Sequence, residues 1–241
     1  MTEALILCAG KGERIKNITK DRIPKPMIRI NGKPFLWYLI QQLKIFGIKD
    51  IVLHVGHKKE KIIEYFKDGS KFNINIKYSI VDKPVGTGGG IKISLPFLKK
   101  DTFFVLNGDS IFLINLKEMY NYHQFNGAEI TISLKWINNK ERYGSVTVDN
   151  RNRIINFMEK LEREGGFINA GIYLINRKLL EGIPSEFISF EREMLPYAIK
   201  ISRKVFGFIE DSYFVDIGTP EGLFNATQEL PDRFYGYINS L

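Results

Sequence analysis

Cysteine and histidine are scarce in this chain, which has one cysteine and three histidines among its 241 residues. A single cysteine excludes a disulfide framework and a zinc site built from cysteines. The histidines, at positions 54, 57 and 123, leave little material for a histidine metal cage. We therefore expect chemistry that needs neither thiol nor imidazole, and we assign no catalytic role to Cys8 or to the histidines.

Long apolar runs are also absent. The strongest run, Ala4–Ala9, has the length of a strand and falls far short of the roughly 18 residues that a membrane span needs. The opening Met-Thr-Glu lacks the basic region and apolar stretch of a signal peptide. Repeats and low-complexity tracts are missing as well. These absences predict a cytoplasmic protein that does not enter a membrane.

Positive charge is in excess, with 35 basic and 27 acidic residues and a net charge of +8. This balance suits a partner rich in phosphate, either nucleic acid or a phosphorylated small molecule. A lysine-rich solvated surface or a biased genome composition explains it equally well. Hydrophobic residues make up 44% of the chain and aromatic residues 13%, which is enough for a large core and excludes disorder.

Strand and helix signals alternate along the first half of the chain. The continuous apolar run at its start is typical of a strand buried on both faces. The predicted strands are Glu3–Ala9, Asp50–Val55, Asn75–Ile80 and Thr102–Asn107, and the predicted helices are Pro34–Phe46, Lys58–Lys67, Gly89–Phe97 and Leu116–Phe125. This alternation predicts a parallel sheet with helices on both faces.

The second half changes character, because its first four strands follow one another closely. The predicted elements are strands at Glu129–Trp136, Ser145–Asp149, Arg153–Met158 and Phe167–Ile175, a helix at Phe190–Ile201, strands at Lys204–Ile209 and Tyr213–Asp216, and a helix at Pro220–Glu229. Short loops cannot hold helical crossovers, so the first four strands must pair largely antiparallel. We expect residues 1–241 to form one α/β domain with a Rossmann-like, mixed and mainly parallel sheet flanked by helices.

A glycine-rich segment, Ala9-Gly10-Lys11-Gly12-Glu13-Arg14-Ile15, follows the first predicted strand. Ligands of open α/β sheets bind beyond the carboxyl ends of the strands. Gly10 and Gly12 would let backbone N–H groups approach an anion, and Lys11 and Arg14 add positive charge. The segment is not a Walker P-loop, and Ile15 stands where the dinucleotide fingerprint has glycine. An ordinary turn also explains the two glycines.

Two further segments suit phosphate or nucleotide binding. Prolines fix the backbone on both sides of Lys25, which favours a lysine held against a phosphate, although a rigid loop alone explains Pro24-Lys25-Pro26. Val85-Gly86-Thr87-Gly88-Gly89-Gly90 predicts a loop that a ligand approaches closely, ahead of an electropositive helix N-terminus. A flexible surface turn is the alternative for this second segment.

Carboxylates stand at two predicted strand ends. Asp109 and Asp216 could bind Mg²⁺, a hard cation that combines one or two protein carboxylates with phosphate oxygens and water. Helix capping or turn formation explains either aspartate alone. Glu159, Lys160 and Asn169 lie near two adjacent predicted strands, where they could bind sugar hydroxyls and a phosphate. A surface ion pair is the alternative for Glu159 and Lys160.

Taken in order, these segments resemble the sugar-phosphate nucleotidyltransferase family. Its pattern has a G-x-G-[T/E]-R-[L/M] loop, a K-P lysine, a G-T-x-G loop, a G-D aspartate, an E-K pair, an I-N-A-G strand and a late D-x-G-T-P. The likeness runs from Ala4 to about Leu230. The resemblance implies a nucleotide-diphospho-sugar transferase fold, in which residues 1–127 bind the nucleotide and residues 128–241 bind the sugar phosphate.

The resemblance also implies roles for single residues. Arg14 and Lys25 are the implied catalytic residues. The nucleotide would contact Ala9, Gly10, Lys11, Gly12, Gly86, Thr87 and Gly88, the sugar phosphate would contact Gly144, Glu159, Lys160 and Asn169, and Asp109 and Asp216 would hold Mg²⁺. The implied partners are a nucleotide triphosphate and a sugar 1-phosphate, without nucleic acid or membrane, and formation of a homodimer is left open.

Within the family, the chain is most similar to guanylyltransferases that act on heptose 1-phosphate. Ile23–Met27, Asn31–Leu36 and Ile188–Glu191 carry that similarity, whereas the Gly-Lys-Gly-Glu-Arg loop is also similar to uridylyltransferases of N-acetylmuramate 1-phosphate. We expect GTP with a heptose or mannose 1-phosphate. The alternative is a uridylyl- or thymidylyltransferase that acts on another sugar 1-phosphate.

The chain departs from the family pattern after Lys160, and two other classes of protein compete with this family. The family E-K-P is here Glu159-Lys160-Leu161, which leaves the path of the sugar loop open. The resemblance is to the short, single-domain members, so we expect no left-handed β-helix. A nucleic-acid-binding module would cluster basic and aromatic residues on one face. A non-catalytic nucleotide-sugar-binding protein would have lost an arginine, a lysine or a metal aspartate of the pattern, and none is missing.

Overall fold

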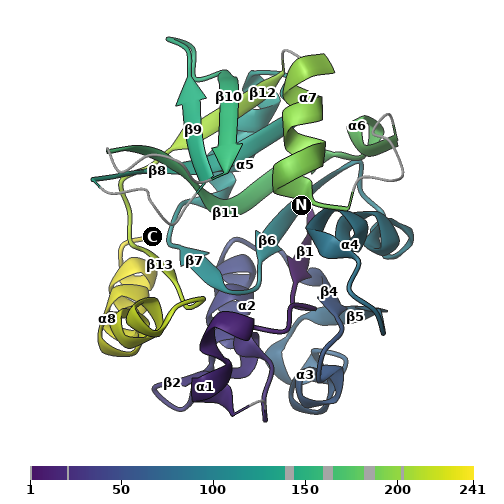
Figure 1. Cartoon of the computed structure of the whole chain (residues 1–241), viewed down its shortest axis with the longest axis vertical. Coiled ribbons are helices and arrows are strands. Elements are labelled where there is room, and N and C mark those ends of the chain that lie inside the picture. The colour runs from purple at the N-terminus through teal and green to yellow at the C-terminus, as the bar shows by residue number, and fades with distance from the viewer. Residues whose placement is uncertain (1, 21, 139–143, 160–164, 182–187, 202–203) are drawn as a thin grey trace.

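Helices cover both faces of a large mixed sheet (Figure 1). The structure, a computed structural model, describes residues 2–20, 22–138, 144–159, 165–181, 188–201 and 204–241. Within these residues the main sheet has nine strands, and its continuous path runs β10-β9-β11-β6-β1-β4-β5. β8 pairs with β11 and β12 beside this path.

The first half of the chain builds the parallel part of the sheet. β1 (Glu3–Leu7), β4 (Asp50–Val55), β5 (Asn75–Ile80) and β6 (Thr102–Asn107) pair in parallel in the order β6-β1-β4-β5. Ala4, Leu5 and Ile6 are fully buried because β1 lies at the centre with helices on both sides. The parallel sheet predicted from the alternation of strands and helices is therefore confirmed.

The second half extends the sheet with antiparallel strands. These are β8 (Ile130–Ile137), β9 (Gly144–Val148), β10 (Ile154–Glu159) and β11 (Gly166–Asn176), with β12 (Val205–Ile209) parallel to β8. β11 joins the two parts because it pairs antiparallel with β6, and Tyr173 lies opposite Val105. The antiparallel pairing expected from the short connections is confirmed.

Shorter elements surround the sheet. The α-helices are α1 (Lys16–Thr19), α2 (Phe35–Ile45), α3 (Lys59–Phe66), α4 (Gly86–Ser94), α5 (Leu116–Phe125), α6 (Arg177–Glu181), α7 (Leu195–Ile201) and α8 (Pro220–Asn239). The 3-10 helices are η1 (Glu13–Ile15), η2 (Lys25–Met27), η3 (Ser70–Phe72) and η4 (Leu95–Phe97), and η5 (Phe190–Met194) is a π-helix. Two short antiparallel pairs lie outside the main sheet: β2 (Arg29–Ile30) with β3 (Lys33–Pro34), and β7 (Ser110–Phe112) with β13 (Phe214–Asp216).

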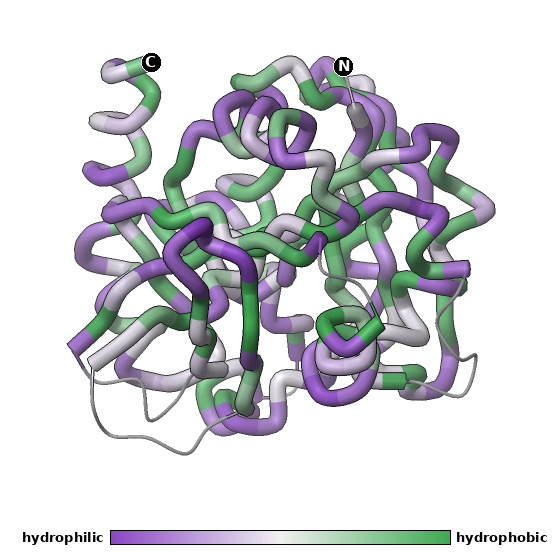
Figure 2. Tube along the Cα trace, turned by 90° about the horizontal axis from the view of Figure 1, so that it is seen from above, coloured by the Kyte–Doolittle hydropathy of each residue, from purple (hydrophilic) through white to green (hydrophobic). Residues whose placement is uncertain are grey.

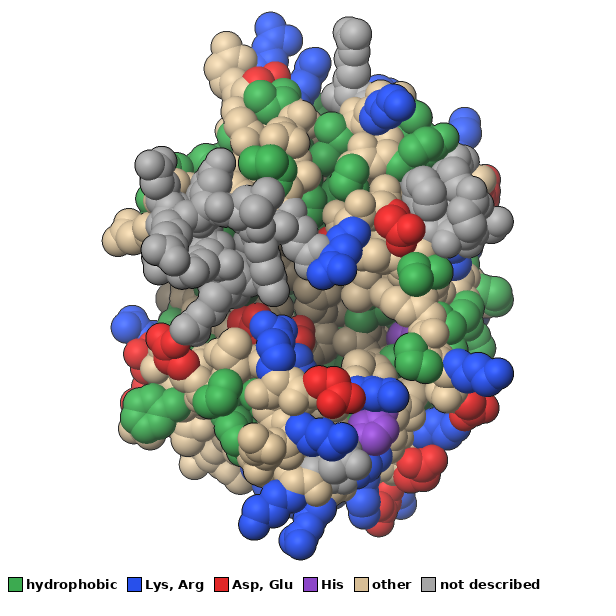
Figure 3. All heavy atoms as spheres, viewed as in Figure 1, with side chains coloured by type: hydrophobic (Ala, Val, Ile, Leu, Met, Phe, Trp, Pro, Cys, Tyr) green, Lys and Arg blue, Asp and Glu red, His purple; other side chains and the backbone are tan. Residues whose placement is uncertain are grey.

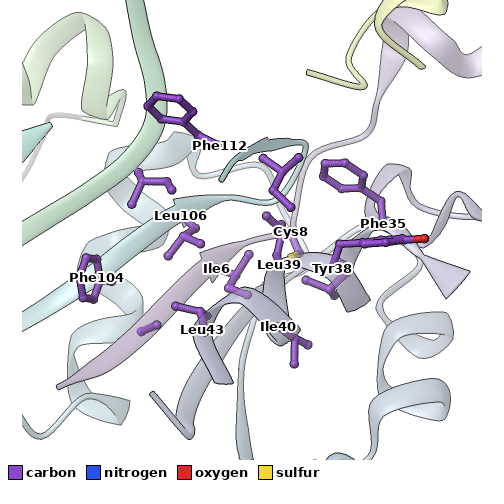
Figure 4. Close-up of a cluster of buried hydrophobic side chains, with 14 of the residues drawn as sticks. Ile6, Cys8, Phe35, Tyr38, Leu39, Ile40, Leu43, Phe104, Leu106 and Phe112 are labelled. Atoms are coloured by element: carbon purple, nitrogen blue, oxygen red, sulfur yellow. The ribbon is translucent and has the colours of Figure 1, made fainter. Parts of the chain in front are cut away.

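A hydrophobic core lies on each face of the sheet. On one face, α2 packs Leu39 and Leu43 against Ile6 of β1 and Leu106 of β6, as Figure 4 shows. The same cluster takes in α8, where Phe234 meets the ring of Tyr38 edge-on with 5.2 Å between centroids. On the other face, side chains of α4, α6 and α7 form a second cluster. Both helix layers thus fix the central strand ends at which the site lies.

Three helices differ from their predicted bounds. α4 begins at Gly86 instead of Gly89, so the glycine segment expected to be a loop forms the first turns of the helix. The first part of Phe190–Ile201 is the π-helix η5. α8 continues past Glu229 to Asn239, because Leu230 and Phe234 prolong its buried stripe through Pro231. Buried packing outweighs the weak helix propensity of glycine and proline at these places.

The hydropathy of the chain follows this layered arrangement. Figure 2 shows hydrophobic segments concentrated in the interior, and it shows α8 at one edge of the molecule, where hydrophobic and hydrophilic residues alternate along the helix. None of the helices in the described ranges combines the length and the apolar character needed to cross a bilayer.

Candidate active site

The glycine segment after β1 turns back toward the segment that holds Lys25. Gly12 has a φ of +66°, in the left-handed region that glycine adopts without strain. A Cβ on Gly12 would lie only 3.4 Å from Cβ of Lys25. Around Gly10, by contrast, a Cβ would have no described atom within 4 Å. Gly12 therefore makes the turn and the close approach, while the backbone at Gly10 stays open to a ligand.

Lys25 is held as rigidly as its flanking prolines predict. It begins η2, in which Met27 N–H donates to the carbonyl of Pro24 over 2.9 Å and Ile28 N–H donates to that of Lys25 over 3.1 Å. Its side chain is only 11% exposed and forms an ion pair with Oδ2 of Asp109. The lysine is thus aimed at the end of β6 and not at solvent.

The two aspartates that end predicted strands lie side by side. Asp109 follows β6, and the chain then enters β7, which pairs antiparallel with β13 so that Asp216 lies opposite Ser110. Ile217 N–H donates to the carbonyl of Asp109 over 2.9 Å. Two positions far apart in the sequence thereby form one carboxylate pair at the carboxyl ends of the strands.

The charged forms of Asp109 and Asp216 repel each other. Burial raises the pKa of Asp216 to about 6, and the negative charge of Asp109 acts in the same direction. The N–H of Gly218, Lys25 and Arg14 oppose this rise by favouring the charged carboxylate. A further positive charge nearby would therefore stabilise the ionised form of Asp216.

Arginine and lysine converge on the same place. A Cβ on Gly218 would lie 2.9 Å from Nη2 of Arg14, 3.3 Å from Nζ of Lys25 and 2.8 Å from Oδ1 of Asp216. Gly218 is the residue that leaves room for these groups to meet. Arg14, Lys25, Asp109 and Asp216, which we name the charged cluster, thus lie together.

The N-terminus of α4 faces this cluster across a cavity. Gly88 N–H and Gly89 N–H donate to the carbonyl of Ile188 over 2.8 and 3.2 Å, which satisfies helix-end donors that lack partners inside the helix. A Cβ on Gly86 would lie 2.2 Å from that carbonyl oxygen. The glycines therefore admit the Ile188 backbone, a close approach that the sequence alone attributed to a ligand.

A cavity of about 450 Å³ lies between these segments. Seven predicted site residues line it, namely Ala9, Gly10, Lys11, Lys25, Gly86, Thr87 and Asp109. Figure 3 shows the surface hollowed near the centre of the face drawn, with charged side chains at its rim. The volume falls within the range of small-molecule sites, about 300–1,000 Å³. Predicted phosphate-binding and base-binding segments thus share one hollow.

The predicted sugar-phosphate residues lie apart from this lining. Gly144 and Glu159 are register partners of β9 and β10, and Asn169 lies on β11. None of these three is among the residues that line the described cavity. Lys160 lies outside the described residues, as does the side chain of Glu159. The structure brings Gly144 and Glu159 together, and it connects Asn169 to the cavity only indirectly.

That indirect connection is a polar network that the sequence did not reveal. Thr87 Oγ1 donates to Oε2 of Glu191 over 2.6 Å, and Tyr173 OH lies 3.4 Å from the other carboxylate oxygen. Asn169 Nδ2 donates to Tyr173 OH over 2.7 Å, and Phe190 N–H donates to Thr87 Oγ1 over 2.9 Å. The Ile188–Glu191 stretch was noted for its family likeness, but no role for Glu191 followed from it.

Cys8 and His54 line the cavity without being placed for acid–base work. Burial, with a contribution from the charge of Asp109, raises the pKa of the Cys8 thiol, so it stays protonated. Burial lowers the pKa of His54 to about 4, so its ring is neutral at pH 7. His54 also packs against Gly90, where a Cβ would lie 2.8 Å from the ring. The absence of a catalytic role for both remains a prediction.

Comparison with known proteins identifies the family. The nucleotidyl transferase family matches residues 3–233. The chain is 43% identical over 224 residues to a D-glycero-alpha-D-manno-heptose 1-phosphate guanylyltransferase of Campylobacter jejuni, spanning 92% of this chain and 97% of that protein. An enzyme of the same name from Aneurinibacillus thermoaerophilus is 39% identical over 230 residues, spanning 95% and 98%.

A solved structure of a related protein has a similar fold. HddC from Yersinia pseudotuberculosis, complexed with GMP-PN, superimposes with a TM-score of 0.84 at 32% identity, over 95% of this chain and 100% of that chain. The chain belongs to the nucleotidyl transferase family and is a nucleotidyltransferase. The predicted nucleotide-diphospho-sugar transferase fold and the family resemblance are both confirmed. The roles of single residues stay predictions.

Proposed function

We propose that this enzyme joins GTP to a heptose or mannose 1-phosphate and releases pyrophosphate. The observation that carries the proposal is the charged cluster beside a cavity lined by two glycine segments. Two polyanions can meet there only if cations offset their repulsion, and Arg14 and Lys25 supply that charge. The names of the relatives, guanylyltransferases of heptose 1-phosphate, and the GMP-PN bound to HddC support guanine and heptose.

The reaction needs positioning and electrostatics more than acid–base catalysis. A phosphate oxygen of the sugar 1-phosphate, largely ionised at pH 7, attacks the α-phosphorus of the nucleotide in line, and the bond to pyrophosphate breaks. Preorganised positive groups stabilise the charge that spreads over the phosphates during this step. In the proposal, Arg14 and Lys25 do this work, while Ala9, Gly10, Lys11 and Gly12 hold the triphosphate.

Asp109 and Asp216 suit a magnesium ion. Mg²⁺ prefers hard oxygen ligands and needs one or two protein carboxylates when phosphates and water fill its other positions. The raised pKa of Asp216 beside Asp109 indicates a place where a divalent cation relieves repulsion. No group of three or more His, Cys, Asp or Glu able to hold a metal occurs among the described residues. When bound, the ion would neutralise phosphate charge, and these two aspartates would hold it.

The remaining roles divide between the two substrates. We assign the base to Gly86, Thr87 and Gly88 and the sugar phosphate to Gly144, Glu159, Lys160 and Asn169, so that residues 1–127 serve mainly the nucleotide and residues 128–241 the sugar phosphate. Support for the sugar side is the hydrogen-bonded path from Asn169 to Thr87. We also place the enzyme in the cytoplasm, in keeping with its free, buried cysteine, and leave a homodimer to measurement.

Pyrophosphate release tests the proposal. GTP, UTP, CTP and dTTP are each offered with heptose, mannose, glucose and N-acetylglucosamine 1-phosphates, with Mg²⁺ and with excess chelator. We expect release only when both substrates and the metal are present, with the highest kcat/KM for GTP. A higher kcat/KM for another nucleotide contradicts the base assignment, and full activity in chelator contradicts the metal role. Failure to release pyrophosphate from any pair contradicts the whole proposal.

A further inference from the structure

A second and larger hollow is also lined by the segment that holds Lys25. Its volume is about 1060 Å³, against about 450 Å³ for the catalytic cavity. One wall comes from residues around η2, β2, β3 and the start of α2, and the other comes from α3 and η3. We name this hollow the basic groove. None of the predicted site residues that the structure describes lines it.

Positive charge is concentrated in the basic groove. Five cationic side chains line it, Arg29, Lys33, Lys61, Lys67 and Lys71, against two acidic ones, Glu64 and Asp68. Lys61 and Glu64 are 3.9 Å apart, and Asp68 accepts hydrogen bonds from the N–H and hydroxyl of Ser70. Figure 3 shows Lys and Arg side chains gathered at the end of the molecule where Figure 1 places α1, β2 and α3, with acidic side chains among them.

Flat rings accompany these charges. The rings of Tyr65 and Phe72 are stacked, with 5.9 Å between centroids and an interplanar angle of 20°. Trp37 lines the groove from α2, and Nζ of Lys33 lies 5.7 Å from the centroid of its ring. Aromatic faces stack on bases, and lysine and arginine bind phosphates, so this combination suits an anion that carries a planar ring. The volume suits one nucleotide, because small-molecule sites reach about 1,000 Å³.

The basic groove and the catalytic cavity share one short, stiff segment. Ile23 and Met27 line the groove, whereas Lys25 and Pro26 line the cavity. Two prolines and the η2 turn join these residues, so a side chain pushed on the groove side shifts the segment as a unit. Lys25 would then lose its position beside Asp109.

We propose that the basic groove is a regulatory site for a nucleoside phosphate, and that its occupation lowers kcat by displacing Lys25. The proposal does not depend on which base or sugar the catalytic cavity takes. A ligand acts in this way only if it binds the displaced arrangement more tightly, so the effect on kcat and the binding must appear and disappear together.

Trp37 reports directly on the groove. The chain has two tryptophans, and Trp136→Phe leaves Trp37 as its single one. We expect GDP, titrated into this variant, to quench the Trp37 fluorescence saturably after correction for nucleotide absorbance. Replacing both Lys33 and Lys71 by glutamine should weaken the apparent affinity at least about tenfold, the usual effect of losing one hydrogen bond to a charged group. Lys117→Gln, at an exposed lysine of α5, is the matched control and should bind like the parent.

Kinetics distinguishes inhibition through the groove from inhibition through the catalytic cavity. Inhibition by GDP bound in the catalytic cavity is competitive and disappears at saturating substrate. Inhibition by GDP bound in the groove lowers kcat and persists, and it should be absent in the Lys33→Gln/Lys71→Gln variant. The proposal is wrong if GDP leaves Trp37 fluorescence unchanged, if quenching survives in the double variant, or if kcat is insensitive to nucleotide while the groove is filled. Tighter quenching by polyglutamate or by a single-stranded oligonucleotide than by GDP would overturn it in favour of a macromolecular partner. The fluorescence result holds even if no sugar 1-phosphate proves to be a substrate.

Discussion

The parallel and antiparallel parts of the sheet contribute to the site by different routes. In the parallel part, the carboxyl ends of β1 and β6 meet at one edge, so the loops after them bring Gly10 and Asp109 to the same cavity. In the antiparallel part, neighbouring strands end at opposite edges. Gly144 and Glu159 therefore meet each other and do not reach the lining of that cavity.

The second half of the chain reaches the cavity through its connections instead. η5 lies against α4 and brings Glu191 into the cavity lining, and β13 pairs with β7 and places Asp216 next to Asp109, which also lines the cavity. The loops after the parallel strands thus place site residues at one shared edge of the sheet. The antiparallel strands do not, and the site residues of the second half come from segments that follow these strands. This contrast predicts that kcat depends on the charged cluster and that substrate affinity depends on the antiparallel part.

The largest expected effect comes from Lys25→Met, which keeps the stem and removes the charge. Lys25 is nearly buried and paired with Asp109, so its charge is preorganised toward the reacting phosphates. Losing one such group typically lowers kcat about 10²–10³-fold. Steady-state pyrophosphate release at saturating Mg²⁺ measures it, with Lys117→Met as the unaffected control.

Lys160→Met is the contrasting variant from the sugar side. It should raise KM for the sugar phosphate and leave kcat near the parent value, because the charge of that phosphate changes less during reaction. If Lys25→Met alters only KM, or Lys160→Met alters only kcat, the division between the two parts of the sheet is wrong.

Gly218→Ala should have the next largest effect. The new methyl group would lie 2.8 Å from Oδ1 of Asp216 and 2.9 Å from Nη2 of Arg14, so both groups must move. A misplacement of about 1 Å can lower turnover about 10²-fold. Gly236→Ala in α8, where a Cβ meets no described atom within 4 Å, is the control. Turnover of Gly218→Ala equal to that of this control would show that the cluster tolerates the displacement.

Local sequence features single out three residues of the charged cluster as candidates, but none singles out Glu191 on the far side of the cavity. Lys25, Asp109 and Asp216 could be found because proline clamps and strand ends are local features. Glu191 could not, since its place depends on η5 packing against α4 from a distant part of the chain. The start of α4 was missed for a related reason. Its glycines disfavour a helix in isolation, and the carbonyl of Ile188 that receives the Gly88 N–H is contributed from far away.

The pH dependence of Asp216 tests the charged cluster directly, with an effect of about tenfold. With a pKa near 6, this carboxyl gains its proton as the pH falls through about 6, well above its ordinary value. A protonated carboxyl is a poor magnesium ligand, so kcat/KM should fall about tenfold between pH 7 and pH 5. Carbon-13 NMR of labelled aspartate, with Asp216→Asn to assign the signal, measures the midpoint in the free enzyme apart from the titration of the substrate phosphate. Mg²⁺ should lower this midpoint, and a midpoint near 4 without Mg²⁺ would contradict the electrostatic account.

The smallest effect on turnover is expected for Thr87→Val, which removes one side-chain link between α4 and η5. The hydroxyl of Thr87 donates to Glu191 and accepts from Phe190 N–H, so valine leaves both without this partner. An unsatisfied buried group costs about 1–3 kcal/mol, which urea unfolding measures, while kcat should fall less than about tenfold because no reacting group moves. Thr87→Ser keeps the hydroxyl and should restore most of the stability.

A double-mutant cycle with Glu191→Gln measures the coupling between the two side chains. A coupling free energy of about 0.5–3 kcal/mol would show that they stabilise each other. Additive losses would mean that the nucleotide side and the sugar side are held independently.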